Sequence, residues 1–190
     1  MKFITQNIKL PEGRRNAKLQ FFDKEDGAIL FQIYNEWREL CDKLAIIGSR
    51  SVNLPEGLSE GAFSLAMNSP RVSGSITKAN SSFDCFELSS NSRIQVKACS
   101  VLPDLTSFGP KTQWDKLFFC DFYRDGSWSG KFDIYHVPNE LIYNHKVNKN
   151  QTFKQQQQEA RRPRLSIFKE IIQANKVKPV LTYDLSIFGR

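Results

Sequence analysis

The sequence contains no long hydrophobic run and few of the residues that build metal clusters. None of its apolar runs approaches the ~18 residues that a membrane-spanning helix needs, which excludes an integral helical membrane protein. Only two histidines are present, His136 and His145, which excludes a multi-histidine metal site and disfavours a histidine-metal nuclease. The N-terminal segment MKFITQNIKLPEGRR has no apolar core followed by small residues, so we expect no signal peptide and a cytoplasmic protein.

Cysteine is also sparse, and its spacing excludes two further classes of protein. The chain has four cysteines and no C-x-x-C pair, which argues against both a disulfide framework and a zinc cluster. Apolar residues are plentiful: 40% of the 190 residues are hydrophobic and 12% are aromatic. A chain of this length and composition can bury a sizeable core, and we expect one globular domain over residues 1–190.

Positive charge is concentrated near the C-terminus. Between residues 144 and 178 the chain carries nine basic and two acidic residues, whereas the remainder carries 18 of each sign. A dense cationic segment releases counterions when it meets phosphates, so nucleic acid is the favoured partner, although a solvated charged face has the same composition. The glutamines between residues 151 and 158 have side chains that bond phosphates or adenine edges, and a short polar linker would look similar.

Two helices are predicted in the first 70 residues. Residues 23–47 show apolar side chains every three or four positions, which is typical of a long helix that packs on a core or on a partner subunit. The stretch LPEGLSEGAFSLAMNSP predicts a shorter helix that contains Glu60 and ends before Pro70. The apolar stripe of the first helix consists of Ile29, Ile33, Trp37, Leu40, Leu44 and Ile47.

Strands are predicted between residues 80 and 138. The segment SSFDCFELSSNSRIQVKACS contains two runs rich in β-branched and aromatic residues around a turn at residues 89–92, which is typical of a hairpin. The runs DKLFFCDFYRD and GKFDIYHVP predict two further strands that are buried on both faces. A short helix is expected near residues 165–174. This order indicates an α/β (α+β) domain with a mixed central sheet flanked by helices: a helical part over about 1–70, a sheet over about 80–138, and a basic DNA-binding segment over about 139–190.

The residues that suggest chemistry lie on the predicted hairpin. Gln95 and Lys97 are two residues apart and therefore share one face of a strand, and Asp84 on the preceding strand can lie beside them. A carboxylate, an amide oxygen and the Val96 carbonyl suit Mg²⁺, which prefers oxygen ligands, and Lys97 would orient or deprotonate the attacking water. Phosphodiester cleavage needs such a centre, because the metal neutralises developing charge and lowers the pKa of bound water. Glu60 is a candidate for a second carboxylate on the ion.

The segment FDCFELSSNSRIQVKACS resembles the catalytic hairpin of the PD-(D/E)XK nuclease superfamily, with glutamine in place of the usual acidic residue and no proline before Asp84. A literal Pro-Asp pair, Pro103 and Asp104, follows Lys97, which is the wrong order for this hairpin, and we interpret it as a turn. The resemblance extends over about residues 51–167. The segments SVNLPEGLSEGAF, RIQVKACSVLPDLTSFGPKTQWDKLFFCDFYRDG and FDIYHVPNELIYNHKVNKNQTFKQQQQEARRPRLSI are similar to small type II restriction endonucleases that recognise the interrupted palindrome GCNGC.

The resemblance implies a restriction-endonuclease-like fold and Mg²⁺-dependent cleavage of both DNA strands, with one or two ions per active site and short 5′ overhangs. It also implies a bacterial or archaeal host and a cognate DNA methyltransferase that forms no stable complex with the enzyme. A palindromic site favours a homodimer, for which the helix over 23–47 is a candidate interface. The candidates for guanine or phosphate contacts are Lys111, Lys154, Gln156, Arg161, Arg162 and Arg164.

Two other functions remain open on the sequence. One is a repair or structure-selective nuclease of the same superfamily, which would share the chemistry but would smear a plasmid instead of cutting it into discrete bands. The other is a basic nucleic-acid-binding module in which the hairpin is structural, and such a module would show no Mg²⁺-dependent cleavage.

Overall fold

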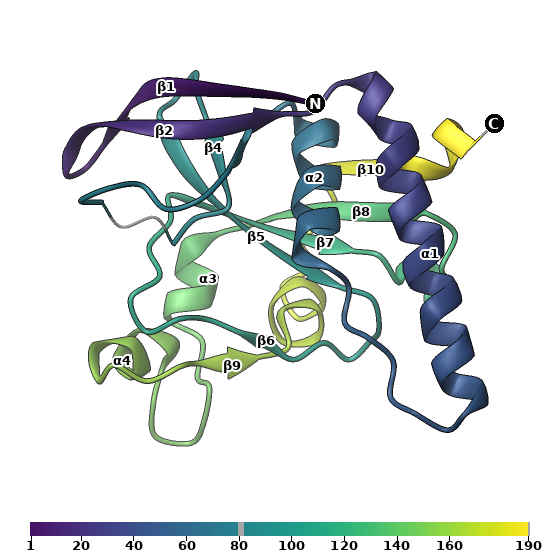
Figure 1. Ribbon diagram of the computed structural model, residues 1–190. Helices are drawn as coiled ribbons and strands as arrows, with labels where there is room; N and C mark the ends of the chain where they lie inside the picture. Colours follow the sequence, from purple (N-terminus) through teal and green to yellow (C-terminus); the bar gives the residue numbers. More distant parts are fainter. Residues whose placement is uncertain (80–81, 190) are drawn as a thin grey trace.

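The computed structural model describes residues 1–79 and 82–189, so the first two residues of the predicted sheet region and the last residue of the basic segment lie outside the described residues. An eight-stranded sheet, in the order β1-β2-β3-β4-β5-β7-β8-β10, runs through the molecule (Figure 1). β5 and β7 are parallel, and the other neighbouring strands of the described sheet are antiparallel. The strands are β1 Lys2–Leu10, β2 Gly13–Phe21, β3 Arg71–Val72, β4 Cys85–Glu87, β5 Ser92–Cys99, β7 Lys116–Asp121, β8 Lys131–Val137 and β10 Leu181–Asp184.

Helices cover both faces of the sheet, which confirms the predicted mixed class. The core between the sheet and α1 and α2 lies on one face, and a second core joins the other face to α3, α4, the π-helix η3 and the small sheet β6–β9 (Figure 1). The helices are α1 Gly27–Ile46, α2 Glu56–Met67, α3 Asn139–Tyr143, α4 Phe153–Gln158 and η3 Ile167–Gln173, with 3₁₀ turns η1 Lys24–Asp26, η2 Arg124–Gly126 and η4 Leu185–Gly189. The small sheet pairs β6 Thr106–Ser107 with β9 Arg164–Leu165.

The predicted strands and the second helix are confirmed. β4 and β5 form the expected antiparallel hairpin, and β7 and β8 are largely buried because helices cover both faces of the sheet. α2 ends at Met67, followed by Asn68 in the left-handed conformation and then by Pro70. The helix expected near residues 165–174 is present as η3.

The N-terminus differs from the helical part expected over residues 1–70, because the chain begins with a β hairpin. Ile8 and Leu10 on β1 alternate with exposed residues, as do Ala17 and Leu19 on β2, and these four side chains are buried. This period of two is that of a strand with one covered face. Gly13, at φ +105°, allows the tight reversal between the strands.

The apolar stripe predicted for the first helix is confirmed only in part, because its member Trp37 is buried and Ile33 packs against the core, but other members are exposed. α1 buries Leu30, Tyr34, Trp37 and Cys41, whereas the predicted stripe members Ile29, Leu40 and Ile47 are 39%, 46% and 75% exposed. The helix has two adjoining apolar stripes, and periodicity alone cannot choose between them. Packing decides: Leu30 closely approaches Gly61 of α2, where the glycine leaves room for the leucine methyl group.

Asp104 is a buried anchor and not the simple turn residue expected from the Pro103–Asp104 pair. Its carboxylate accepts hydrogen bonds from the Ser166 hydroxyl at 2.7 Å and from the backbone amides of Ile167 and Phe168 at 2.9 and 3.0 Å. These amides belong to the first turn of η3, so Asp104 satisfies donors that have no partner within the helix. The contact ties the segment after β5 to η3.

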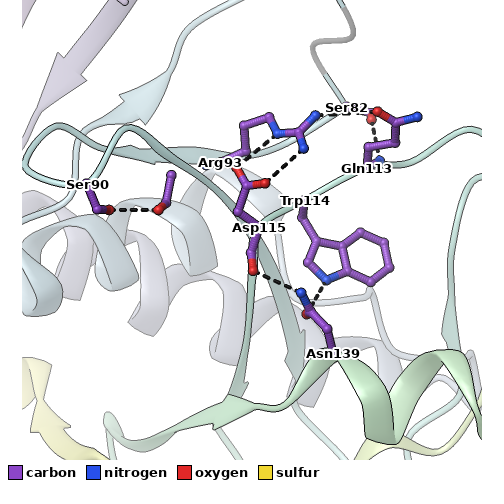
Figure 2. Close-up of polar contacts among 8 residues, drawn as sticks. Ser82, Ser90, Arg93, Gln113, Trp114, Asp115 and Asn139 are labelled. Atoms are coloured by element: carbon purple, nitrogen blue, oxygen red, sulfur yellow. Dashed lines mark hydrogen bonds and ion pairs between the residues drawn. The ribbon is translucent and has the colours of Figure 1, made fainter. Parts of the chain in front are cut away.

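A polar network fixes the segment that leads into β7 (Figure 2). Arg93 on β5 binds both carboxylate oxygens of Asp115, with nitrogen–oxygen distances of 3.0 and 2.9 Å. Asn139, at the start of α3, donates to the Asp115 carbonyl at 2.9 Å and accepts from the Trp114 indole at 2.8 Å. Since Trp114 also stacks on Tyr143, the network holds β5, β7 and α3 in one arrangement.

Replacing Arg93 by alanine is expected to lower the free energy of unfolding by about 2–3 kcal/mol, because it removes several charge-assisted bonds from a buried guanidinium. The half-exposed position of Asp115 keeps the cost below that of a fully buried pair. Urea unfolding measures the change. In the matched control, Lys43→Ala breaks only the exposed Lys43–Glu39 pair and should change stability by less than about 1 kcal/mol. Equal effects of the two substitutions would contradict the structural role of Arg93.

Candidate active site

A cleft of about 610 Å³ opens beside β5. Its walls are the residues that lead into α2, the first turn of that helix, and the segment after β5 that runs into β6. Asp84, Lys97 and Glu60 all line it. The structure therefore brings together in one cleft the ionisable residues that the sequence suggested for chemistry.

Asp84 immediately precedes β4 and lies directly beside β5. Its Oδ2 atom accepts a hydrogen bond from the backbone amide of Val96 at 2.7 Å and another from the side-chain amide of Gln95. Its Oδ1 atom accepts no hydrogen bond from the described residues, and the residue lines the cleft. One carboxylate oxygen is thus held by the sheet while the other is left for a ligand.

Gln95 is almost fully buried, at 3% exposed, and its amide is only half satisfied. The nitrogen donates to Asp84, but the Oε1 atom has no hydrogen-bond partner among the described residues. A buried carbonyl oxygen that lacks a hydrogen bond lowers the stability of the folded protein. Such an oxygen next to a carboxylate therefore needs a physical explanation.

The electrostatics of the cleft favour a cation. Enclosure of its carboxyl by protein, reinforced by the negative charge of Glu60, raises the pKa of Asp84 to about 7. Burial also raises the pKa of Glu60, although the nearby Arg71 guanidinium opposes this shift. Ionisation of both carboxyl groups is therefore disfavoured. A cation that enters the cleft favours the ionised form of both groups.

Glu60 is anchored from behind. The Nε atom of Arg71, on β3, donates to the Glu60 carboxylate at 2.5 Å, and the Nη1 atom of Arg71 donates to Gln20 on β2 at 3.2 Å. Glu56, one turn earlier on α2, also lines the cleft, and its charge raises the pKa of both Glu60 and Asp84. Sequence reasoning missed Glu56 and Arg71. The spacing Glu56–Glu60 on a predicted helix was the available signal for Glu56.

Lys97 presents an uncommitted ammonium group to this cleft. The residue is half-buried, and its Nζ atom lies 5.3 Å from the centre of the Phe108 ring. Lys97 forms no ion pair or hydrogen bond within residues 1–79 and 82–189, yet its charge acts on Asp84 and Glu60. An amine that is near two carboxylates but bonded to neither is free to meet a substrate.

The raised pKa of Asp84 predicts a pH-dependent stability. In an unfolded chain the carboxyl has its ordinary pKa of 3.8, so between that value and about 7 the folded protein binds a proton that the unfolded chain has released. Stability of the metal-free protein should therefore fall as pH rises from about 4 to about 7, by up to about 4 kcal/mol from this group. Urea unfolding in a chelator at pH 5 and pH 8 measures it.

Asp84→Asn, which has no proton to lose, should remove most of this pH dependence and should be more stable than wild type at pH 8. The control Asp42→Asn changes an exposed carboxylate paired to Arg38 and should leave the slope as it is. An unchanged slope in Asp84→Asn would show that the carboxyl ionises at its ordinary pKa.

The six residues predicted to contact DNA lie in the region of α4 and β9. Lys111 and Lys154 line a second, smaller pocket of about 310 Å³ together with Gln157. Arg161 pairs with Glu159 at 3.2 Å. The other three candidates are Gln156, whose side-chain amide bonds Gln151, and the exposed Arg162 and Arg164. Their roles in DNA binding remain a prediction.

The fold and the comparisons now define what kind of protein this is. A mixed α+β domain with a large sheet and an acidic cleft with a lysine at its wall is restriction-endonuclease-like in architecture. The Bsp6I restriction endonuclease family model matches residues 22–174. The chain is 32% identical over 166 residues to the type II restriction enzyme Bsp6I of Bacillus sp. (strain RFL6), which covers 86% of this chain and 90% of that protein. No solved structure matches the chain.

The chain therefore belongs to the Bsp6I restriction endonuclease family, which confirms the enzyme class predicted from the sequence. In residues 1–79 and 82–189, none of the helices has the length and apolar character needed to cross a bilayer.

Proposed function

We propose that this protein is a type II restriction endonuclease that cleaves duplex DNA at the palindrome GCNGC with a Mg²⁺-dependent, PD-(D/E)XK-type centre. The observation that carries the proposal is that Asp84 and Lys97 line one cleft, while Gln95 bonds Asp84 from the buried side. The Gln95 carbonyl has no partner among the described residues and lies beside a carboxylate of raised pKa. The relative Bsp6I supports the class of enzyme, and the resemblance of the longer sequence segments supports the DNA site.

The donors in the cleft fit a magnesium ion. No three His, Cys, Asp or Glu side chains converge on one point in the described part of the chain, so a metal site with three or more such ligands is not available there. Mg²⁺ needs no such group, because it binds through one or two carboxylates and keeps several waters. The oxygens of Asp84, the Gln95 amide, the Val96 backbone and Glu60 would hold the ion, which would satisfy the buried Gln95 carbonyl.

The chain's own residues divide the work of hydrolysis. Asp84 supplies the negative charge at the centre, and its Oδ2 atom is positioned by the Val96 amide and Gln95. Lys97 orients the attacking water as an ammonium donor, or takes the water's proton in its neutral amine form, since its nitrogen is uncommitted and its charge acts on the carboxylates. A bound Mg²⁺ supplies charge neutralisation at the phosphate and a lower pKa for the water. Arg71 keeps Glu60 pointed at the cleft.

A homodimer fits the palindrome, with each protomer cutting one strand. The second apolar stripe of α1 supports this helix as the interface, because its members Ile29, Leu40 and Ile47 are exposed. Binding would rest on phosphate and guanine contacts from the six cationic and amide residues near α4 and β9. In the host, a cognate methyltransferase would protect the same sites without stable association with the nuclease.

Digestion of a sequenced plasmid with Mg²⁺, followed by mapping of the ends, tests enzyme, metal and site together. We expect discrete fragments whose ends all fall in GCNGC, and no cutting in a chelator. Lys97→Ala protein purified in parallel controls for contaminating nucleases. A smear would favour a structure-selective nuclease, and DNA binding without any cleavage would favour a non-catalytic binding module.

A further inference from the structure

We propose that the β1–β2 hairpin is a second DNA-contacting surface, which lies against the phosphates of the duplex that adjoins the cut site. The first 21 residues carry five basic residues and one acidic residue. The chain outside residues 144–178 carries equal numbers of basic and acidic residues, so its total charge does not reveal this local excess. The match to the family begins at residue 22, directly after β2 ends at Phe21. The hairpin is therefore a basic element outside the region that the family model describes.

One face of the hairpin belongs to the protein core. Ile8 and Leu10 pack with Ala17 and Leu19 in a buried cluster that Val72 of β3 joins. Side chains alternate along a strand, and cross-strand partners share a face, so the neighbouring residues of both strands point the other way. These neighbours form the exposed face of the hairpin: Phe3, Thr5, Asn7, Lys9, Arg14, Asn16 and Lys18.

The exposed face is cationic and contains no carboxylate. Lys9 lies directly opposite Arg14 in the strand register. Like charges in such a cross-strand pair oppose folding of the hairpin. The Arg14 Nη1 atom reaches Asn7 Oδ1 at 3.4 Å, and Lys18 Nζ lies over the Phe3 ring at 4.7 Å. Lys9, Arg14 and Lys18 form no ion pair in the part of the chain that the structure describes. An anionic partner would therefore reduce the repulsion between Lys9 and Arg14.

The same face leads to the cleft. Gln20, two residues beyond Lys18 on β2, accepts the hydrogen bond from Arg71, and Arg71 holds Glu60 in the cleft wall. From Gln20 to Arg14 the strand extends roughly 20 Å, at about 3.3 Å per residue. That length matches roughly six base pairs of duplex, at about 3.4 Å each. In Figure 1 the hairpin projects away from α1 and α2, with its turn at the outer edge of the molecule.

A duplex bound in the cleft can therefore continue along the hairpin beyond the recognised bases. A two-stranded antiparallel ribbon also fits the width of the DNA major groove, and the chain belongs to a family of DNA-cutting enzymes. Charge and shape both favour DNA over a protein partner at this face, because three uncompensated cations with intervening amides suit a row of phosphates.

The test compares a triple variant, Lys9→Gln/Arg14→Gln/Lys18→Gln, with a control of equal charge change, Lys24→Gln/Lys43→Gln/Lys131→Gln, whose exposed lysines lie outside the hairpin. Affinity is measured in a chelator for two duplexes that carry the mapped cut site, one with minimal flanks and one with flanks of about six base pairs, the reach of the hairpin. Thermal unfolding verifies that both variants fold.

Wild type and control are expected to bind the flanked duplex more tightly, and the hairpin variant to bind the two duplexes equally. For three lost phosphate contacts, the slope of log affinity against log salt should fall in magnitude by about 2.7. No gain from flanks in wild type, or a full gain in the hairpin variant, would overturn the proposal. Equal losses in both variants would assign the effect to net charge and also overturn it. Plasmid cutting is measured in a separate experiment. A wrong assignment of the DNA site or the metal is therefore distinguished from a lack of DNA contact by the hairpin.

Discussion

Replacing Lys97 by alanine is expected to lower the single-turnover rate of DNA cleavage by about 10²- to 10⁴-fold, the range that a positioned proton-transfer group contributes. The ammonium lies in the cleft with Asp84 and Glu60, and no ion pair or hydrogen bond within the described residues occupies it. Duplex binding should change little, because many other cations contribute to it. Quench-flow cleavage and binding in a chelator measure the two quantities separately.

Two further variants make this prediction sharper. Lys97→Arg keeps the positive charge, but its guanidinium does not give up its proton. If Lys97 transfers a proton during cleavage, the cleavage rate of Lys97→Arg should be nearly as low as that of Lys97→Ala. Substantial activity in Lys97→Arg would assign the residue an electrostatic role only. Lys116→Ala is the matched control, since this neighbouring-strand lysine bonds Glu87 at 2.6 Å and does not line the cleft. Full activity in Lys97→Ala would remove the cleft as the active site.

Asp84→Asn is expected to reduce cleavage by about 10³-fold, which corresponds to about 4 kcal/mol of lost transition-state stabilisation at the centre. The substitution preserves the shape of the side chain and an oxygen that can accept the Val96 amide, but it removes the negative charge. Because the folded protein disfavours that charge, the variant should lose activity without losing stability. Single-turnover cleavage at increasing Mg²⁺, together with urea unfolding, tests both parts.

Gln95→Glu provides the opposite change at the same centre. A second carboxylate against Asp84 should destabilise the metal-free protein through like-charge repulsion and should lower the Mg²⁺ concentration needed for half-maximal cleavage. An Asp84→Asn variant that cuts normally, or a Gln95→Glu variant that is indifferent to Mg²⁺, would show that the ion binds elsewhere.

Local sequence signals predicted much of this fold correctly. The β-rich runs on either side of residues 89–92 predicted the β4–β5 hairpin, and the two-residue spacing of Gln95 and Lys97 placed both side chains on one face of a strand. The order of residues in this hairpin also predicted that Asp84 can lie beside Gln95, and the two side chains are in contact. These inferences succeed because they depend on contacts close in sequence.

Prediction was less successful where segments distant in sequence meet. The basic character of the β1–β2 hairpin was missed because the net charge was summed over all residues outside 144–178. In that total, acidic residues elsewhere cancel the positive charge of the hairpin. Arg71 could not be linked to the cleft, since β3 meets α2 only after the sheet has formed, whereas the helical spacing from Glu60 was an unused signal for Glu56. Asp104 was interpreted from its proline neighbour, while the partners that tie it to η3 lie 62 or more residues away.

The sequence by itself determined the class of the domain, the hairpin with Asp84, Gln95 and Lys97, and the cationic character of the C-terminal segment, because periodicity and charge are local properties. Only the tertiary structure decided which apolar stripe of α1 is buried, which carboxylates share the cleft, and which residues keep them there. The physical reason is that burial depends on what packs across a face. The same packing encloses Asp84 and leaves the Gln95 carbonyl without a partner among the residues that the structure describes, which no linear pattern shows.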